Sequence, residues 1–129
     1  MNYYITINDF KIENVYFFNP IKNTMLINSS YIKVIYSTID VVLNSIHILI
    51  PCDINNNILN YYKDRIISIE TQILDKYSNK KQCNNILHNI KTNNCYNKCN
   101  NNCILKISGI WENKNECGLI YKYVYPSVL

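Results

Sequence analysis

The sequence predicts a single α+β domain in which strands dominate and one long helix interrupts them. Three observations lead to this prediction: strand-like runs occupy the region before Pro51, a helical period follows it, and a strand hairpin ends the chain. At 129 residues, with 48% hydrophobic and 17% charged residues, the chain is long and apolar enough to bury one core. We therefore expect one domain over residues 1–129.

The N-terminal region contains short runs typical of edge strands. They are expected at residues 3–7, 14–18 and 24–27. Residues 31–38 and 41–50 are longer, are rich in Ile, Val and Tyr, and meet at the short Ile39-Asp40 connection, so they predict a hairpin. Isoleucine occupies every second position from 46 to 50, as in a half-buried strand, and Pro51 ends the run.

A helix is predicted over residues 55–77. Apolar side chains recur there at steps of three and four and share one stripe: Ile58, Tyr62, Ile66, Ile69, Ile73 and Tyr77. Polar residues from Asp53 to Asn57 can cap its first amides, and Ser78-Asn79 ends it. We expect three acidic side chains to face solvent: Asp64, Glu70 and Asp75.

The last third of the chain combines an insert with a hairpin. Residues 79–103 are rich in Asn and Cys and predict an inserted long loop. Strands are expected at 104–111 and 119–125, joined by a turn at 112–118. The sequence predicts three core strands before the helix and two after it. This is the order of a five-stranded OB-like barrel, whose helix lies between the third and fourth core strands. The earlier runs are then extra N-terminal strands.

The composition limits the partners. A net charge of +4 and a pI near 8.7 favour anionic ligands but fall short of a dedicated duplex binder. No segment has the pattern of a signal peptide, and polar residues interrupt the most apolar run, 41–50, so no membrane partner is expected. We therefore expect an intracellular protein with reduced cysteines, located in the host cytoplasm or nucleus if its source is viral.

The C-terminal hairpin carries the strongest functional pattern. Trp111, Tyr121 and Tyr123 alternate with cations, a pattern that suits bases stacking on rings and phosphates meeting ammonium groups. The candidate nucleic-acid-binding residues are Tyr31, Lys33, Lys106, Trp111, Tyr121, Lys122 and Tyr123. Aromatic residues at alternate strand positions also suit a core face. Because apolar residues occur at both parities, the sequence leaves open which face of this hairpin is buried.

A resemblance to a known family adds to this interpretation. Residues 105–112 (LKISGIWE), a polar turn, and residues 118–122 (GLIYK) resemble the closing segment of OB-like single-stranded-DNA-binding proteins of large DNA viruses. The resemblance implies binding and protection of single strands during DNA replication, with Trp111 and Lys122 as the matching positions. The absence of Ala and the many Asn, Ile, Lys and Tyr residues are compatible with an AT-rich viral genome.

The cysteines and histidines suggest other chemistry. Four thiols in the insert could bind one zinc ion, although Cys-x3-Cys-x3-Cys lacks the paired knuckles of common zinc modules: Cys83, Cys95, Cys99 and Cys103. Zinc is the one cofactor that the sequence suggests. The alternative is that these cysteines are reduced thiols in a loop. Neither His47 nor His88 lies in a recognisable catalytic motif, and no phosphate-binding glycine loop occurs, so no enzyme is expected.

The leading hypothesis is a non-catalytic protein that binds single-stranded DNA or RNA. One alternative is a viral structural or adaptor protein that uses a Tyr-rich surface to contact protein, since aromatic residues are enriched at such interfaces. A zinc-stabilised binding module is a further alternative. The sequence leaves self-association and a viral protein partner open.

Overall fold

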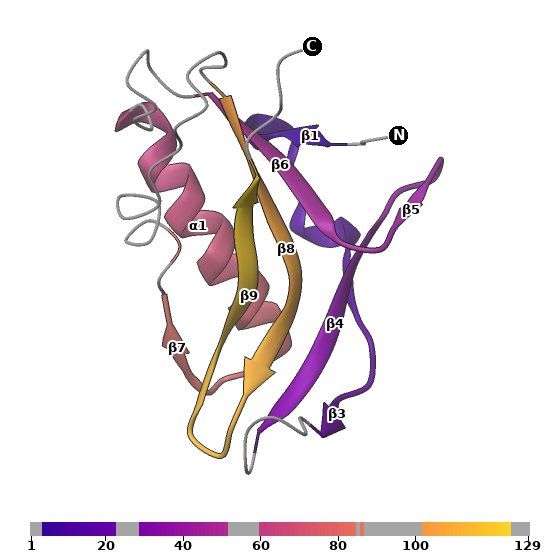
Figure 1. Cartoon of the computed structure of the whole chain (residues 1–129), viewed down its shortest axis with the longest axis vertical. Helices are drawn as coiled ribbons and strands as arrows, with labels where there is room; N and C mark the ends of the chain where they lie inside the picture. Colours follow the sequence, from indigo (N-terminus) through magenta and orange to yellow (C-terminus); the bar gives the residue numbers. More distant parts are fainter. Residues whose placement is uncertain (1–3, 23–28, 52–59, 85, 87–101, 125–129) are drawn as a thin grey trace.

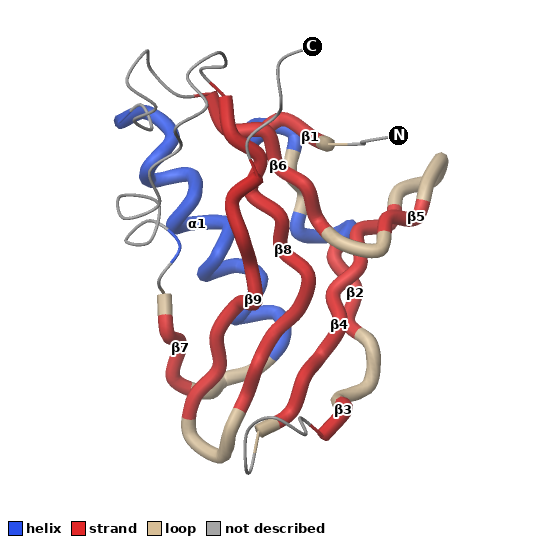
Figure 2. The backbone as a smooth tube through the Cα atoms, in the orientation of Figure 1, coloured by secondary structure: helices blue, strands red, loops and turns tan. Residues whose placement is uncertain are grey.

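The computed structural model describes residues 4–22, 29–51, 60–84, 86 and 102–124. In this part of the chain one mixed sheet is covered on one side by a single helix (Figures 1 and 2). The helix is α1 (Asn60–Tyr77), and two short 3-10 turns precede it, η1 (Ile7–Asp9) and η2 (Ile12–Asn14). The strands are β1 (Ile5–Thr6), β2 (Val15–Phe17), β3 (Ile21–Lys22), β4 (Ser30–Ser37), β5 (Val42–Leu43), β6 (Ile46–Pro51), β7 (Lys81–Cys83), β8 (Asn102–Glu112) and β9 (Glu116–Val124).

The long strand β8 is the centre of the sheet. Along one edge it pairs first with β6 and then with β4, and along the other it pairs with β9, all antiparallel. β1 and β7 add parallel pairs to β6 and β9, while β2, β3 and β5 pair with β4. The predicted α+β class, mostly β with one helix, is confirmed. Over the described residues the sheet is open and mixed, without the closed barrel that was expected.

The core lies between α1 and one face of the sheet. The helix contributes Ile66, Ile69, Ile73 and Leu74, all buried, and packs against β9, η1 and η2. The sheet contributes alternate residues of its strands: Ile32, Val34, Ile46, Ile48, Ile50, Leu105, Ile107, Ile110 and Leu119. Burying each such side chain contributes about 1.5–3 kcal/mol to the stability of the fold. The apolar stripe of α1 and the alternating apolar residues of β6 therefore hold the helix against the sheet.

The predicted helix is confirmed over Asn60–Tyr77, with one correction. Glu70 was expected to face solvent, but its side chain is only 3% exposed. It follows Ile69 and precedes Ile73 and Leu74, so it lies at the margin of the buried stripe. The buried stripe of α1 includes Leu74. It is therefore wider than the stripe that was predicted from apolar residues at steps of three and four.

Two cations of α1 hold the N-terminal segment against the helix. The Lys76 Nζ donates to the carbonyl oxygens of Ile12 and Val15 at 3.0 and 2.8 Å. The Arg65 Nη2 donates to the Phe10 carbonyl oxygen at 3.3 Å. Because these bonds give partners to backbone carbonyls between Phe10 and Val15, they stabilise the path from η1 to β2.

Several strand predictions are confirmed with shifted limits, and others lie outside the described residues. The expected strand 41–50 is divided at Asn44-Ser45 into β5, which completes a short hairpin with β4, and β6, which pairs with β8. The predicted strand at 24–27 and the first residues of the predicted helix are not described. Of the predicted insert at 79–103, the structure describes residues 79–84, Ile86 and residues 102–103. The prediction of a loop is corrected at β7 and at the start of β8, which are strands. No helix in the described part of the chain is long and apolar enough to cross a membrane.

Candidate nucleic-acid interface

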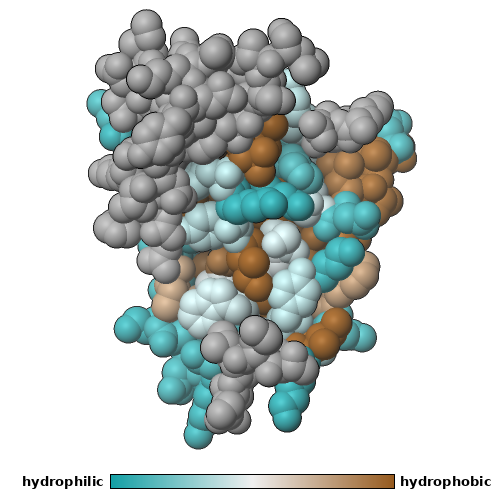
Figure 3. Space-filling model, in the orientation of Figure 1, coloured by the Kyte–Doolittle hydropathy of each residue, from teal (hydrophilic) through white to brown (hydrophobic). Residues whose placement is uncertain are grey.

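The face of the sheet opposite α1 is called the open face below. In Figure 1 the helix passes behind β8 and β9, so the viewer sees this face, and Figure 3 shows pale and teal surface across its middle with brown patches between. Strand register and the burial of the alternate residues place the following side chains on it: Tyr31, Lys33, His47, Leu49, Ile104, Lys106, Trp111, Ile120, Lys122 and Val124.

Two aromatic rings lie flat on the open face, each over a glycine. A Cβ built on Gly118 would meet Cε2, Nε1 and Cζ2 of Trp111 at 2.7, 2.7 and 2.8 Å. Because these three ring atoms are almost equidistant, the indole covers Gly118 with its face. A Cβ built on Gly109 would meet the Tyr31 ring at 2.5 Å, so this ring also lies over backbone. Both rings are half-buried and turn their other side outward.

The two rings are neighbours in register. Tyr31 of β4 pairs directly with Trp111 of β8, and Trp111 pairs with Gly118 of β9. The Tyr31 hydroxyl donates to the Ser108 carbonyl oxygen at 3.2 Å, which fixes the phenol ring across β8. The chain has only two glycines, and both lie beneath these rings. The arrangement forms a two-ring platform on a rigid sheet.

A β-bulge at Ser108 places the rings and the cations on the same face. Lys106 and Trp111 are five positions apart, so regular alternation along β8 would turn them to opposite faces. The register shifts between Ile107 and Gly109, because two residues of β8 there oppose one step of β9. The Ser108 hydroxyl donates to the Ile120 carbonyl oxygen at 3.3 Å across the bulge.

Three basic side chains form a row across the open face. His47 of β6 pairs with Lys106 of β8, which in turn pairs with Lys122 of β9. Like charges directly opposite in a sheet destabilise it by about 0.2–1 kcal/mol per pair. No Asp or Glu occurs in the strand segments 31–35, 46–51, 102–111 and 118–124, and within the described residues none of the three forms an ion pair. An anion bound here would relieve the repulsion.

The lysines of this row affect the pKa of the His47 imidazole. Burial of the ring, followed by the charge of Lys106, lowers the pKa of His47 below its ordinary value of 6.5. A backbone hydrogen bond with Ser45 opposes the shift, and the charge of Lys122 adds to it. The ring is therefore mainly neutral at pH 7, and a nearby phosphate would raise its pKa again.

A third cation, Lys33, lies on the open face between the rings and the row. Lys33 pairs in register with Gly109, and its Nζ lies 5.7 Å from the centroid of the exposed Phe18 ring. This cation–π contact holds the ammonium group at the β4 side of the open face. The geometry thus combines stacking surface with fixed positive charge on one flat surface.

Comparisons of the chain with protein-family models, curated proteins and solved structures find no match. The interpretation of the open face therefore rests on its own geometry.

The structure brings together five of the seven candidate nucleic-acid-binding residues. Tyr31, Lys33, Lys106, Trp111 and Lys122 all lie on the open face. The expectation for Tyr121 and Tyr123 is corrected, because they share the parity of the buried Cys117 and Leu119 and pack against the core on the side of α1. The Tyr123 hydroxyl donates to the Ile86 carbonyl oxygen at 2.7 Å. Their place on the open face is taken by Ile120, Lys122 and Val124.

The candidate zinc ligands are only partly described. Cys83 is level with Gly118, whereas the residue after Cys103 is level with Val124 at the other end of β9. Six residues of strand separate these levels, which is about 20 Å, too far for one ion to bind both thiolates. The Cys83 thiol donates to the Glu116 carboxylate at 3.0 Å, and this hydrogen bond raises the pKa of the thiol. Cys95 and Cys99 lie outside the described residues, so the zinc site stays a prediction without support from Cys83 and Cys103.

Sequence reasoning did not assign His47 to the site. Its cross-strand neighbours Lys106 and Lys122 come from a distant hairpin, so no local pattern reveals the row. A signal for the bulge is present, because an isolated glycine within a strand pattern, here Gly109, often marks one. That signal could have predicted that Trp111 and Lys106 share a face.

Proposed function

We propose that this chain is a non-catalytic protein that binds single-stranded nucleic acid through the open face, acting in DNA replication or in protection of single strands. One observation carries the proposal: the directly opposed Lys106 and Lys122 lie on the same face as the glycine-backed Trp111 ring. The repulsion between the lysines destabilises the free protein, and an anionic ligand would offset it. The outward ring surfaces are suited to stacking, which every base permits.

The two parts of the open face have separate roles in this proposal. Bases stack on Trp111 and Tyr31, whose rings are held in place by the glycines and by the Ser108 carbonyl. Phosphates lie toward Lys33 and the row of His47, Lys106 and Lys122. Since stacking does not read base identity and lysines contact phosphate as point charges, the proposal implies little sequence specificity.

We also infer an OB-like relationship for the fold. The order of two long strands, one helix and a closing hairpin supports it, as does β4, whose first half pairs with β8 and second half with β2. The resemblance of residues 105–112 and 118–122 to single-stranded-DNA-binding proteins of large DNA viruses agrees with the proposed function. In the resemblance Trp111 and Lys122 are the matching positions, and both lie on the open face.

Titration of a labelled oligothymidylate by fluorescence anisotropy tests the function. Trp111→Ala is compared with Tyr61→Ala, because Tyr61 is 73% exposed on α1, away from the open face. Loss of one stacking ring costs about 1–3 kcal/mol, so Trp111→Ala is expected to weaken binding by roughly 5- to 150-fold. Tyr61→Ala is expected to bind like the unmodified chain. Equal affinity of both variants would remove Trp111 from the interface.

A second function is favoured by a separate observation. Tyr16, Phe18 and Ile21 are 51%, 50% and 62% exposed along the β2 and β3 side of the sheet. An adaptor protein would use such an apolar edge to contact a protein partner. Lys106→Glu and Lys122→Glu separate the two functions, since a protein contact at this edge would tolerate both substitutions far better than a phosphate contact would.

A further inference from the structure

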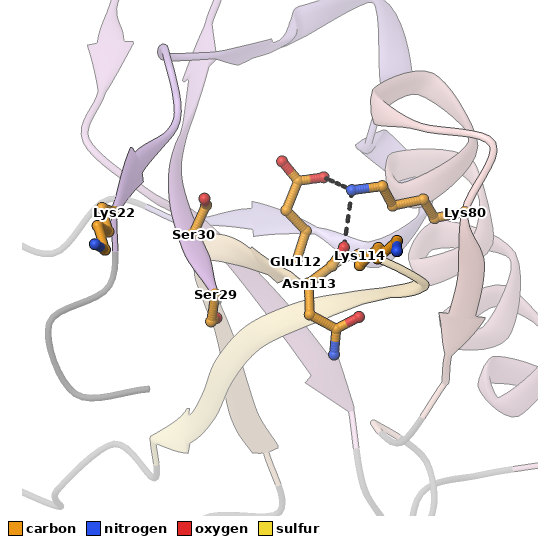
Figure 4. Close-up of a pocket in the computed structure, with 7 residues that line it drawn as sticks. All are labelled: Lys22, Ser29, Ser30, Lys80, Glu112, Asn113 and Lys114. Atoms are coloured by element: carbon orange, nitrogen blue, oxygen red, sulfur yellow. Dashed lines mark hydrogen bonds and ion pairs between the residues drawn. The ribbon is translucent and has the colours of Figure 1, made fainter. Parts of the chain in front are cut away.

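A hollow of about 350 Å³ lies at the end of the sheet beside the turn between β8 and β9. Its wall is formed by elements that are far apart in the sequence (Figure 4). Lysines line it from β3, from the segment after α1 and from the β8–β9 turn: Lys22, Lys80 and Lys114. Three cations from three elements around one hollow require an explanation, because they repel one another.

The one acidic side chain in the wall is already paired. The Glu112 carboxylate accepts a hydrogen bond from the Tyr77 hydroxyl at 2.7 Å and forms an ion pair with the Lys80 Nζ at 3.0 Å. Lys80 also donates to the Asn113 carbonyl oxygen at 2.8 Å. Glu112 and Lys80 therefore neutralise each other. Lys22 and Lys114 have no ion pair within the described residues, which leaves the hollow with a positive charge.

Neutral donors complete the wall. The Ser29 hydroxyl is buried and, in the described part of the chain, has no hydrogen-bond partner. The Asn113 Oδ1 accepts bonds from the amides of Asn115 and Glu116 at 2.9 and 2.8 Å, so its amide nitrogen is oriented as a donor. A buried hydroxyl without a partner costs free energy, and a small shift of the wall at Ser29 would bring this hydroxyl within reach of an acceptor oxygen in the hollow.

We propose that this hollow is a second anion site that binds a phosphomonoester group. Such a group has three terminal oxygens, accepts several hydrogen bonds at once and carries the charge that Lys22 and Lys114 require. The hollow also has the size of a small-molecule site, so a nucleotide as well as a free phosphate can enter it. The site stands on its own lining residues and does not require nucleic acid on the open face.

The location of the hollow connects it with the platform. The pair Tyr31 and Trp111 is followed along the two strands by the pair Ser30 and Glu112, which lines the hollow. Alternation turns Ser30 and Glu112 to the α1 side of the sheet, where Glu112 bonds with Tyr77. A strand stacked on the two rings would thus reach the site by passing around the end of the sheet beside the β8–β9 turn. This link, which rests on the proposed function, identifies a terminal phosphate of a single strand as one source of the ligand. Free nucleotides are the other source.

Isothermal titration with inorganic phosphate and with a nucleoside monophosphate tests the site in the full chain. Lys22→Gln/Lys114→Gln removes both free cations, and each single variant is measured as well. Lys11→Gln is the control for the loss of one positive charge, because Lys11 is an exposed lysine just before η2. The double variant is expected to bind phosphate at least about tenfold more weakly, whereas the control binds it unchanged. No phosphate binding by the unmodified chain, or equal binding by the double variant, would overturn the proposal.

Oligonucleotides with a 5′-phosphate, a 3′-phosphate or neither identify the source. Tighter binding of one phosphorylated strand, lost in the double variant, assigns the site to a strand end. Equal binding of all three strands, with phosphate binding retained, assigns it to free phosphate or nucleotide. Failure of the open face is distinguishable, because it would abolish binding of the oligonucleotide without a terminal phosphate and leave the titration with inorganic phosphate unchanged.

Discussion

The indole ring of Trp111 in β8 covers Gly118, its cross-strand partner in β9. A side chain at residue 118 would occupy the space of the ring, since a Cβ there would lie 2.7 Å from Cε2 of the indole. The absence of a side chain at Gly118 therefore allows Trp111 to lie flat over the backbone and to present its outer side. The Tyr31 ring likewise lies over Gly109, although Tyr31 pairs in register with Trp111.

Gly118→Ala should displace the indole and weaken both folding and binding. The added methyl group overlaps ring atoms, and such overpacking typically costs about 1–3 kcal/mol. Urea denaturation measures the loss of stability, and anisotropy with a labelled oligonucleotide measures the loss of affinity. Trp111→Ala combined with Gly118→Ala is the control, because without the ring the new methyl group has no indole to displace. A single Gly118→Ala variant as stable as the unmodified chain would contradict the described packing.

Lys122→Glu should affect stability and binding in opposite directions. Replacing the repulsion between Lys106 and Lys122 by attraction should stabilise the fold by about 0.2–1 kcal/mol. Oligonucleotide binding should weaken, and the slope of log affinity against log salt should decrease by about one unit per lost phosphate contact. Lys11→Glu makes the same change of charge away from the open face and should leave the slope unchanged. A Lys122→Glu variant with unaltered affinity would argue for the adaptor function.

His47 should make stability depend on pH. Burial and the charge of Lys106 lower the pKa of His47 in the folded state, so the unfolded chain binds this proton more readily. The contribution is complete above the unfolded pKa of 6.5 and is lost progressively as the pH falls below it. Urea denaturation between pH 7.5 and 5, compared with His47→Gln, measures this difference; these pH limits are roughly one unit or more on either side of the ordinary histidine pKa. If the free energies of unfolding of the unmodified chain and of His47→Gln changed with pH in parallel, the lowered pKa of His47 would be contradicted.

Protonation of His47 should have the opposite effect on binding: it should strengthen the affinity for the oligonucleotide. A phosphate close to His47 favours the protonated ring, so the complex takes up a proton and the affinity should rise as the pH falls through this range. His47→Gln should remove the effect. An affinity that falls on acidification would contradict a phosphate position beside the row.

Tyr77→Phe should destabilise the fold by about 1–2 kcal/mol, because the Glu112 carboxylate loses a charge-assisted hydrogen bond of 2.7 Å. Burial and the neighbouring Glu112 raise the pKa of Tyr77, so the hydroxyl stays a donor at all neutral pH values. The Phe ring retains the edge contact with Phe17 at 5.3 Å between centroids. Urea denaturation measures the effect, and the exposed Tyr61→Phe is the control. Equal stability of both variants would contradict the described bond.

The helix and the strand runs could be predicted because their patterns are local. Ile66, Ile69 and Ile73 recur at helical spacing, and all three are buried. Alternation in β6 placed Ile46, Ile48 and Ile50 on one face, and the structure buries them together. Glu70 was misplaced because periodicity gives the direction of a stripe but not its width.

The facing of the last hairpin could not be predicted from the sequence. Both parities of β9 carry apolar residues, with Tyr121 and Tyr123 on one and Ile120 and Val124 on the other. The buried Cys117 and Leu119, which pack on the side of α1, determine the outcome. The row of His47, Lys106 and Lys122 depends on pairing between distant strands, which no local pattern specifies. The bulge at Ser108 then decides which residues of β8 join it.

Intrinsic fluorescence tests the central claim most directly, because Trp111 is the only tryptophan of the chain. We predict that adding single-stranded oligonucleotide at low ionic strength changes the Trp111 emission to saturation, as a base stacks on the ring, and that added salt reverses the change. An emission that stays constant at low ionic strength while anisotropy reports a bound oligonucleotide would show that the strand binds elsewhere and would contradict the open face as the binding surface.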